Sequence, residues 1–302
     1  MTAPCPFARR IIALTVAGVL AAGSPAPASA AELQPQTARA FDAYARAVEE
    51  RGRLELSSGQ GFLGSDFQDR AAAPAVRRRI VAGGVPVERV FERARDAQLI
   101  EVPDGLINHW RGAILVPRAN LDQVLTELQS PQTRRHVQDD VLESRVLWRR
   151  GDESQIFLKL MRKKIVTVTY NTEHHVRYVR LSPTTASSQS VSTRIAEVDD
   201  AGTPAEREKP VGVDRGFMWR LHSYWRYQQV PEGVIIELES LTLSRDIPTV
   251  IKFVAGPIID AIARESLTRT LESVRGRLLA AGGGRADAAI HAPVHVPEAG
   301  HR

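Results

Sequence analysis

The sequence predicts an α+β protein: a seven-stranded antiparallel sheet covered by a long C-terminal helix, with a helical extension at the N-terminus. Two observations carry this fold class. Apolar and polar residues alternate with a period of two over seven segments joined by short turns, as in antiparallel strands. The last pair of segments is followed by an amphipathic segment of helical period, which offers a cover for one face of the sheet.

The first thirty residues are expected to be a signal peptide, so they are excluded from the fold. Arg9 and Arg10 precede an apolar run over 11–22, and Ala28-Ser29-Ala30 supplies a small-residue cleavage site. The run is shorter than the ~20 residues that a membrane-spanning helix needs. We therefore expect export to the periplasm or the medium after cleavage near Ala30. The paired arginines leave the export route open.

Composition excludes several classes of function. Without residues 1–30 the net charge is about +3, which is too balanced to predict a nucleic-acid partner. Basic runs at 77–79 and 162–164 suit an anionic headgroup or phosphate, although a solvated surface is the favoured interpretation. The single cysteine, Cys5, lies in the leader, so the remaining chain has no disulfide and no thiolate chemistry.

The N-terminal half contains two helices and one strand. Apolar residues at helical spacing predict a helix over 36–51, and residues 52–75 are interpreted as a connection, rich in Gly, Ser, Asp and Ala. Residues 106–116 alternate as a strand that Pro117 ends. Asn120 and Gln123 then resemble a capping box at the start of a short helix that stops near Pro131.

The C-terminal half is read as a series of strands followed by a helix. The helix begins after Pro248, is expected to bend at Gly256-Pro257, and carries a Glu265 to Arg269 pair on its outer side. Residues 282–302 are small and polar and are expected to be disordered. The predicted strands are 141–150, 154–170, 174–181, 185–198, 216–229 and 234–243, with a turn at Asn171-Thr172 and a long loop at 199–213.

The last two strands form a ribbon whose turn, Val230-Pro231-Glu232-Gly233, fixes the pairing so that opposite residue numbers sum to 463. One face is then apolar with a few hydroxyls, and we expect the C-terminal helix to cover it. The other face is charged and is interpreted as an external charge ladder. It pairs Arg226 with Glu237, Tyr224 with Glu239 and His222 with Leu241.

The order of elements, together with the stretch from His222 through Tyr227 and from Glu237 to Pro248, resembles the START-like (SRPBCC, helix-grip) superfamily. In that family a curved sheet grips the last helix, and a cavity between them binds an apolar ligand. The resemblance covers about residues 85–280, so the chain is expected to have four parts: 1–30 signal peptide, 31–84 N-terminal helix and linker, 85–280 helix-grip domain and 281–302 tail. No catalytic signature of the family is matched.

Residues on the helix side of the sheet are the candidates for a ligand site. The hydroxyls on this otherwise apolar face would each need a partner if they were buried in a dry core, which favours a cavity over a solid core. The candidate residues are Trp110, Ile114, Leu221, Ser223, Trp225, Leu238, Ser240, Thr242, Ile262 and Leu267.

Other constellations do not support chemistry. The segment from Gly59 to Gly64 matches a dinucleotide-binding fingerprint in letters, but it does not open a helix packed on a parallel sheet, so a flexible loop is favoured. His174 and His175 are adjacent and would point to opposite faces of a strand, so we read them as surface residues near a turn. The histidines of the tail suit adventitious metal binding only. Glu237 and Glu239 could act as paired carboxylates and His222 with Tyr224 as an acid-base pair, but an outer sheet face excludes little water.

The sequence therefore predicts no catalytic residues, no cofactor and no metal. The leading hypothesis is an exported binding or carrier protein for an apolar or amphipathic small molecule, such as a lipid, with Gly256-Pro257 as a hinge or gate. One alternative is a cyclase- or hydrolase-like enzyme on the same fold. Another is a membrane- or protein-interaction module that uses Phe253-Val254 and Ile258-Ile259, with transient membrane contact. Ligand identity and oligomeric state stay open.

Overall fold

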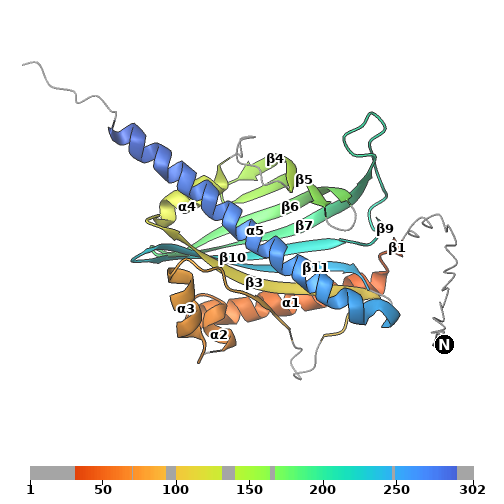
Figure 1. Cartoon of the computed structure of the whole chain (residues 1–302), viewed down its shortest axis with the longest axis horizontal. Coiled ribbons are helices and arrows are strands. Elements are labelled where there is room, and N and C mark those ends of the chain that lie inside the picture. The colour runs from red at the N-terminus through yellow and green to blue at the C-terminus, as the bar shows by residue number, and fades with distance from the viewer. Residues whose placement is uncertain are drawn as a thin grey trace, which may run out of the picture.

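A computed structural model describes residues 31–69, 71–92, 100–130, 140–163, 167–246 and 249–290. The fold class is confirmed: an α+β chain with one large antiparallel sheet and helices on both of its faces (Figure 1). The helices are α1 (Pro35–Ser57), α2 (Ser65–Gln68), α3 (Ala73–Val81), α4 (Leu121–Gln129) and α5 (Thr249–Ile290). The long strands are β3 (Gly105–Pro117), β4 (Val141–Arg150), β5 (Glu153–Lys163), β6 (Thr167–Ser182), β7 (Thr185–Asp199), β10 (Arg220–Val230) and β11 (Gly233–Arg245).

The main sheet has the order β2-β3-β11-β10-β7-β6-β5-β4, in which β2 (Val87–Arg89) is a short edge strand. The two-residue β8 (Arg207–Glu208) pairs with β7, and β1 (Ala31–Glu32) pairs separately with β9 (Val213–Asp214). Neighbouring strands of the main sheet are antiparallel throughout. The number of long strands, seven, is the number that alternation predicts.

The predicted register of the ribbon is confirmed. Arg226 lies opposite Glu237 and Tyr224 lies opposite Glu239, and every pair from Arg220 with Leu243 to Val230 with Gly233 sums to 463. The capping box of α4 is also present: the Asn120 side chain accepts from the Gln123 backbone N–H at 2.8 Å, and the Gln123 side chain accepts from the Asn120 N–H at 3.3 Å.

The predicted turn at Asn171-Thr172 is wrong. Strand β6 runs through both residues, and Asn171 pairs with Lys159 on one side and Ala196 on the other. Strand β5 ends instead at Lys163, and β6 begins at Thr167. The turn propensity of an Asn-Thr pair is small beside the cost of removing backbone hydrogen bonds from the centre of a sheet.

The N-terminal region is more ordered than the sequence indicates. Helix α1 continues to Ser57, and α2 and α3 lie where an aperiodic connection is expected. The short helices contain some of the Ser, Asp and Ala residues that led to that interpretation. They are held in place by packing on the sheet, because Leu63 and Ile80 bury against Ala113 and Ile235 in one apolar cluster.

Helix α5 crosses one face of the sheet, and α1 lies against the other (Figure 1). Leu267, Leu271 and Leu278 of α5 join the largest apolar cluster of the sheet. A side chain at Gly112 would come within 2.9 Å of Leu271, so the missing Cβ allows the close approach of β3 and α5. On the outer side Arg269 donates to Glu265 at 2.5 Å, which confirms the predicted pair.

Helix α5 passes through Gly256 and Pro257 without interruption and extends to Ile290, beyond its predicted end near Leu279. Its side chains are described for 260–282 only, so those of Phe253-Val254 and Ile258-Ile259, which the interaction-module alternative uses, are not among them. The signal peptide and the last twelve residues of the predicted tail, 291–302, lie outside the described residues. Within the described helices, none is both long and apolar enough to span a bilayer.

Candidate functional site

A row of small hydroxyl side chains crosses the centre of the sheet on the face beneath α5. Ser240 of β11, Ser223 of β10 and Ser190 of β7 lie opposite one another on adjacent strands, and Trp110 of β3 continues the row. The three serines are half-buried even though their strands are central. Side chains this small leave space between a sheet and a helix that larger residues would fill.

Two buried polar atoms on this face have no hydrogen-bond partner among the described residues. They are Trp110 Nε1 and Asn108 Oδ1, and Asn108 lies opposite Thr242 in the next row. The Trp110 ring is 5% exposed and lies under the Arg264 guanidinium of α5 at 5.7 Å. A buried donor or acceptor without a partner costs about 1–3 kcal/mol, so this site is short of hydrogen-bonding partners in the absence of another molecule.

The predicted ligand residues divide into two groups on this face. Trp110, Ile114, Leu238 and Leu267 are in the main core cluster, and Trp225 packs against it and stacks on Tyr227 at 6.5 Å. This end of the interface is filled. The other five, Leu221, Ser223, Ser240, Thr242 and Ile262, are half-buried, and Leu221 packs against a second core cluster that contains Tyr170 and Ile195.

Sequence reasoning missed three residues of this face: Asn108, Ser190 and Ser192. The Ser192 hydroxyl accepts from the Leu221 backbone N–H at 3.0 Å, and its strand partner His174 is 2% exposed. Asn108 was detectable, because it stands two residues before Trp110 on the same predicted strand. The serines were not, because their alignment with β10 depends on a register that the long 199–213 connection leaves undetermined.

The charged face of the ribbon is buried, so its interpretation as an external ladder is wrong. Glu237, Glu239, Arg226 and His222 are all less than 9% exposed. Helix α1 and the loop before α2 cover them, and the cover brings its own charges. Arg51 of α1 pairs with Glu239, with Glu92 at 2.8 Å and with Glu55 at 3.0 Å.

Glu239 is the centre of this cluster. Its carboxylate meets His109 Nε2 at 2.6 Å, Arg111 Nη2 at 2.9 Å and Arg51. Burial opposes ionisation, but the charge of Arg111, the His109 hydrogen bond and the charge of Arg51 outweigh it and hold the pKa of Glu239 well below its usual value. The carboxylate is therefore ionised and fully partnered, and it is unsuited to general acid catalysis.

A chain of hydrogen bonds leads from Glu239 through His109 to Tyr44 of α1. His109 Nδ1 is 3.0 Å from the Tyr44 hydroxyl, which accepts from the Glu92 N–H at 2.9 Å. The ionised Glu239 carboxylate can only accept, so Nε2 is the ring nitrogen that donates to it, and a neutral ring then accepts from the Tyr44 hydroxyl at Nδ1. Burial raises the pKa of Tyr44 to about 12. The chain of hydrogen bonds resembles a catalytic relay in composition, but helix α1 covers it, and Tyr44 is only 5% exposed.

The glycine-containing loop is an anion-binding loop for the protein's own Glu237. The carboxylate accepts from the Gly64 N–H at 2.5 Å and the Ser65 N–H at 3.0 Å, at the start of α2. Arg226 donates to the Phe62 carbonyl at 2.8 Å and to Glu55 at 2.5 Å. The expected ion pair between Arg226 and Glu237 is therefore replaced by two separate sets of contacts: Arg226 binds Glu55 and Phe62, and Glu237 binds the backbone at the start of α2.

Buried histidines provide a further correction. His174 is buried in the middle of β6 and bonds Thr172 Oγ1 at 3.0 Å, so its interpretation as a surface residue is wrong, whereas the side chain of His175 is partly exposed. Burial lowers the pKa of His174 to about 4, and burial likewise lowers that of His222 to about 4. Both are neutral at physiological pH.

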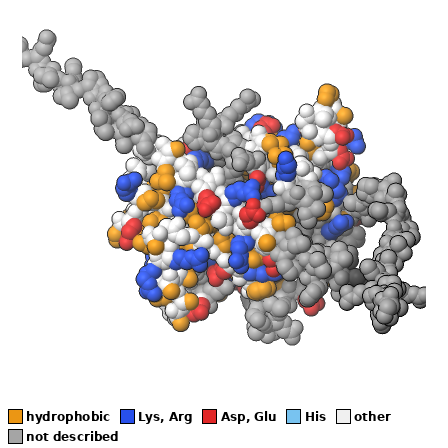
Figure 2. Space-filling model, viewed as in Figure 1, with side chains coloured by type: hydrophobic (Ala, Val, Ile, Leu, Met, Phe, Trp, Pro, Cys, Tyr) orange, Lys and Arg blue, Asp and Glu red, His pale blue; other side chains and the backbone are white. Residues whose placement is uncertain are grey.

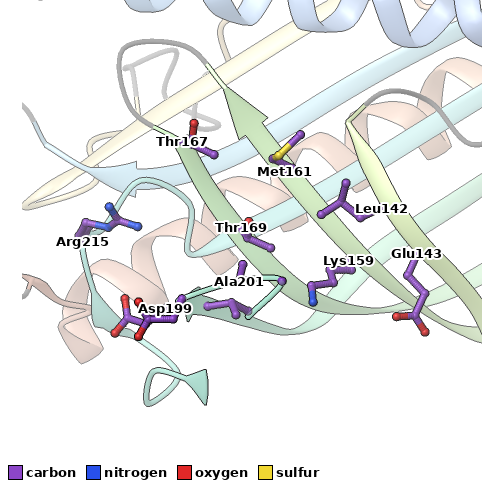
Figure 3. A pocket seen from close by; sticks show the side chains of 12 residues that line it. Leu142, Glu143, Lys159, Met161, Thr167, Thr169, Asp199, Ala201 and Arg215 are labelled. Carbon is purple, nitrogen blue, oxygen red and sulfur yellow. The ribbon is translucent and has the colours of Figure 1, made fainter. Parts of the chain in front are cut away.

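A separate open pocket of about 600 Å³ lies over β4 to β7 (Figure 3). Leu142, Met161 and Thr169 line it, with Lys159 and Arg215 among its charged residues. Both cations are occupied, because Lys159 pairs with Glu206 at 2.6 Å and Arg215 with Glu197 at 2.6 Å. None of the predicted ligand residues lines this pocket. Across the described part of the chain, no group of His, Cys, Asp and Glu is arranged to hold a metal ion.

No family model matches the chain, and no curated protein matches it. Among solved structures it is similar to human STARD10, with 10% identity over 82% of this chain and 83% of that chain and a TM-score of 0.45. It is also similar to human StAR-related lipid transfer protein 5 (14% identity, 82% and 98%, TM-score 0.40) and to a STAR-related lipid transfer protein of Xanthomonas axonopodis (15% identity, 59% and 95%, TM-score 0.41).

These matches are likenesses of chain arrangement. The fold itself is read from the strand order, from α5 across one face of the sheet and from the short helix α4 between β3 and β4. Together they give this chain the arrangement that the sequence predicts, an antiparallel sheet that packs against a long C-terminal helix.

Proposed function

We propose that the protein binds an apolar or amphipathic small molecule, such as a lipid, between the sheet and α5. The observation that carries the proposal is the hydroxyl row beside two buried polar atoms that have no hydrogen-bond partner within the described part of the chain. A solid core would bury Ser223 and Ser240 completely and would give the polar atoms partners. An amphipathic ligand with one polar group would supply the missing hydrogen bonds and fill the space beside Leu221 and Ile262 with apolar atoms.

The chemistry of this face favours binding over catalysis. Its polar groups are neutral hydroxyls, an amide and an indole, and the neutral His174 lies at its far side. The charged residues of the ribbon that the sequence offered as catalytic candidates face α1 instead. A cyclase- or hydrolase-like activity stays a prediction with no assigned residue. Two of the solved structures that are similar to this chain are lipid transfer proteins, which is in line with a carrier role.

Native mass spectrometry of protein purified without detergent tests the proposal. We expect a co-purified small molecule that is lost in Ser223→Phe, because the ring would occupy the space above the central strands. Ser57→Phe, at an exposed position on α1, is the control and should retain the ligand. A ligand-free wild-type protein together with a crystal structure whose interior is filled by side chains would exclude a binding site here.

Export is part of the proposed function. The first described residues, Ala31 and Glu32, pair with Asp214 and Val213 in the small two-stranded sheet, so cleavage after Ala30 would leave every described strand and helix intact. N-terminal sequencing of the protein recovered from an exporting host should begin at Ala31. An N-terminus that retains the apolar run 11–22 in a cytoplasmic fraction would refute export.

A further inference from the structure

Strand β4 exposes a concentration of large apolar side chains at the edge of the sheet. Leu142, Val146, Leu147 and Trp148 are 41–49% exposed, and they account for four of the eleven exposed large hydrophobic residues of the described chain. β4 pairs with β5 and ends the strand order. Edge strands are normally protected by charges or by a covering element. An exposed apolar edge therefore indicates a surface that contacts a membrane or another molecule.

The charges on β4 are mostly positive. The strand carries Arg145, Arg149 and Arg150 against one glutamate, Glu143, which pairs with Arg145 at 2.6 Å. Arg149 and Arg150 have no ion-pair partner among the described residues, and Asp152 of the following turn is the nearest acidic residue in sequence. Figure 2 shows basic, acidic and hydrophobic side chains interspersed over the face of the molecule that α5 crosses.

Aromatic and basic groups are combined here in the manner of a membrane interface. Arg150 lies 5.9 Å over the Trp148 ring, and Arg145 lies 4.3 Å over the ring of Phe157 on β5. Tryptophan favours the boundary between headgroups and acyl chains, and arginine keeps its charge at the headgroups while its stem lies along apolar surface. The β4 edge, defined as Leu142 to Arg150, thus presents apolar contact area and cationic groups together.

We propose that the β4 edge docks onto an anionic bilayer surface. Charge complementarity favours a bilayer over a second copy of the chain, because two β4 strands paired edge to edge would bring six arginines into one ribbon. One row of paired residues connects this edge with the interior face. Val146 pairs with Ile156, Ile156 pairs with His174, and His174 pairs with Ser192. Docking rests on β4 alone and holds whether or not the proposed ligand site is correct.

Vesicle flotation with a matched pair of variants tests the docking surface. The protein that cells produce from the full chain is mixed with vesicles of phosphatidylcholine alone or of phosphatidylcholine with phosphatidylglycerol. We expect binding to the anionic vesicles that salt weakens, and a loss of about tenfold or more in Leu147→Ser/Arg150→Gln. The control, Leu54→Ser/Arg53→Gln on α1, removes the same residue types, and Leu54 is 53% exposed. It should bind like wild type.

A second readout locates the contact. In a Cys5→Ser background the chain has no cysteine, so an environment-sensitive fluorophore can be attached at Val146→Cys on β4 or at Leu54→Cys on α1. We expect a blue shift with anionic vesicles at β4 only. Equal binding by both double variants, equal binding to neutral vesicles, or a dimer in sedimentation that Leu147→Ser/Arg150→Gln dissociates would each overturn the proposal. If the wild-type protein binds anionic vesicles but carries no co-purified ligand, the result would count against the ligand site alone.

Discussion

His109 Nε2 lies 2.6 Å from Glu239 Oε1 on a face of the sheet that the sequence pattern predicts to be exposed to solvent. Both residues are at most 5% exposed. The polar face of the ribbon is therefore the inner side of a second interface, in which α1 supplies Tyr44 and Arg51. The sheet has two covered faces of different character: a charged one under α1 and an apolar one with hydroxyls under α5.

Neutralising Glu239 is expected to destabilise the protein strongly. Glu239→Gln would leave Arg51 and Arg111 in the interface without their shared carboxylate, and breaking a buried ion pair typically costs about 3–5 kcal/mol. Urea unfolding followed by circular dichroism measures the loss. Glu143→Gln, which removes a half-exposed carboxylate on β4, should change the free energy of unfolding by less than about 1 kcal/mol. Equal losses in both variants would contradict a central role for Glu239.

Stability is expected to fall as the pH drops from about 6.5 to about 4. In the folded protein burial lowers the pKa of both His174 and His222 to about 4, whereas their ordinary value is 6.5. Between these values the unfolded chain binds more protons, so acid favours unfolding, by roughly 3 kcal/mol for each histidine. Above about pH 6.5 these two residues contribute no slope.

Unfolding free energies across this pH range check the histidine contribution. His222→Gln and His174→Gln should each flatten the dependence, while His175→Gln, at a partly exposed position, should leave it unchanged. A wild-type slope that persists in the His174→Gln/His222→Gln double variant would assign the acid sensitivity to the carboxylates instead.

The ribbon and α4 could be predicted from the sequence because their determinants are local. A short turn fixes which residues of β10 and β11 face each other, and Asn120 and Gln123 form a cap within four residues. The burial of Glu237 could not be predicted, because its partners at Gly64 and Ser65 lie far away in the sequence. Alternation shows that two faces differ, but it does not show which of them is covered when the cover itself is polar.

Gly64 is expected to be intolerant of a side chain. A Cβ at this position would lie 2.7 Å from Arg111 Cζ, so Gly64→Ala would displace either the guanidinium from Glu239 or the loop from Glu237. We expect a loss of about 2 kcal/mol or more. Gly276→Ala on α5 is the matched control: nothing lies within 4 Å of its Cβ, and alanine favours the helix by up to about 1 kcal/mol. In thermal unfolding we expect Gly64→Ala to lower the stability and Gly276→Ala to raise it. Two variants of equal stability would show that the loop adapts.

A substitution at Trp110 distinguishes a ligand site from a dry core. Its Nε1 is buried without a partner among the described residues, so Trp110→Phe removes an unsatisfied donor at the cost of a smaller ring. If a ligand accepts from Nε1, the variant should lose about 1 kcal/mol of binding free energy, roughly a fivefold weaker affinity, with little change in the stability of the ligand-free protein. Competition between wild type and variant for the co-purified molecule, read by native mass spectrometry, measures this ratio. Equal occupancy of the two proteins would show that the indole N–H does not contact the ligand, and the search for the polar group would move to Asn108 and the serine row.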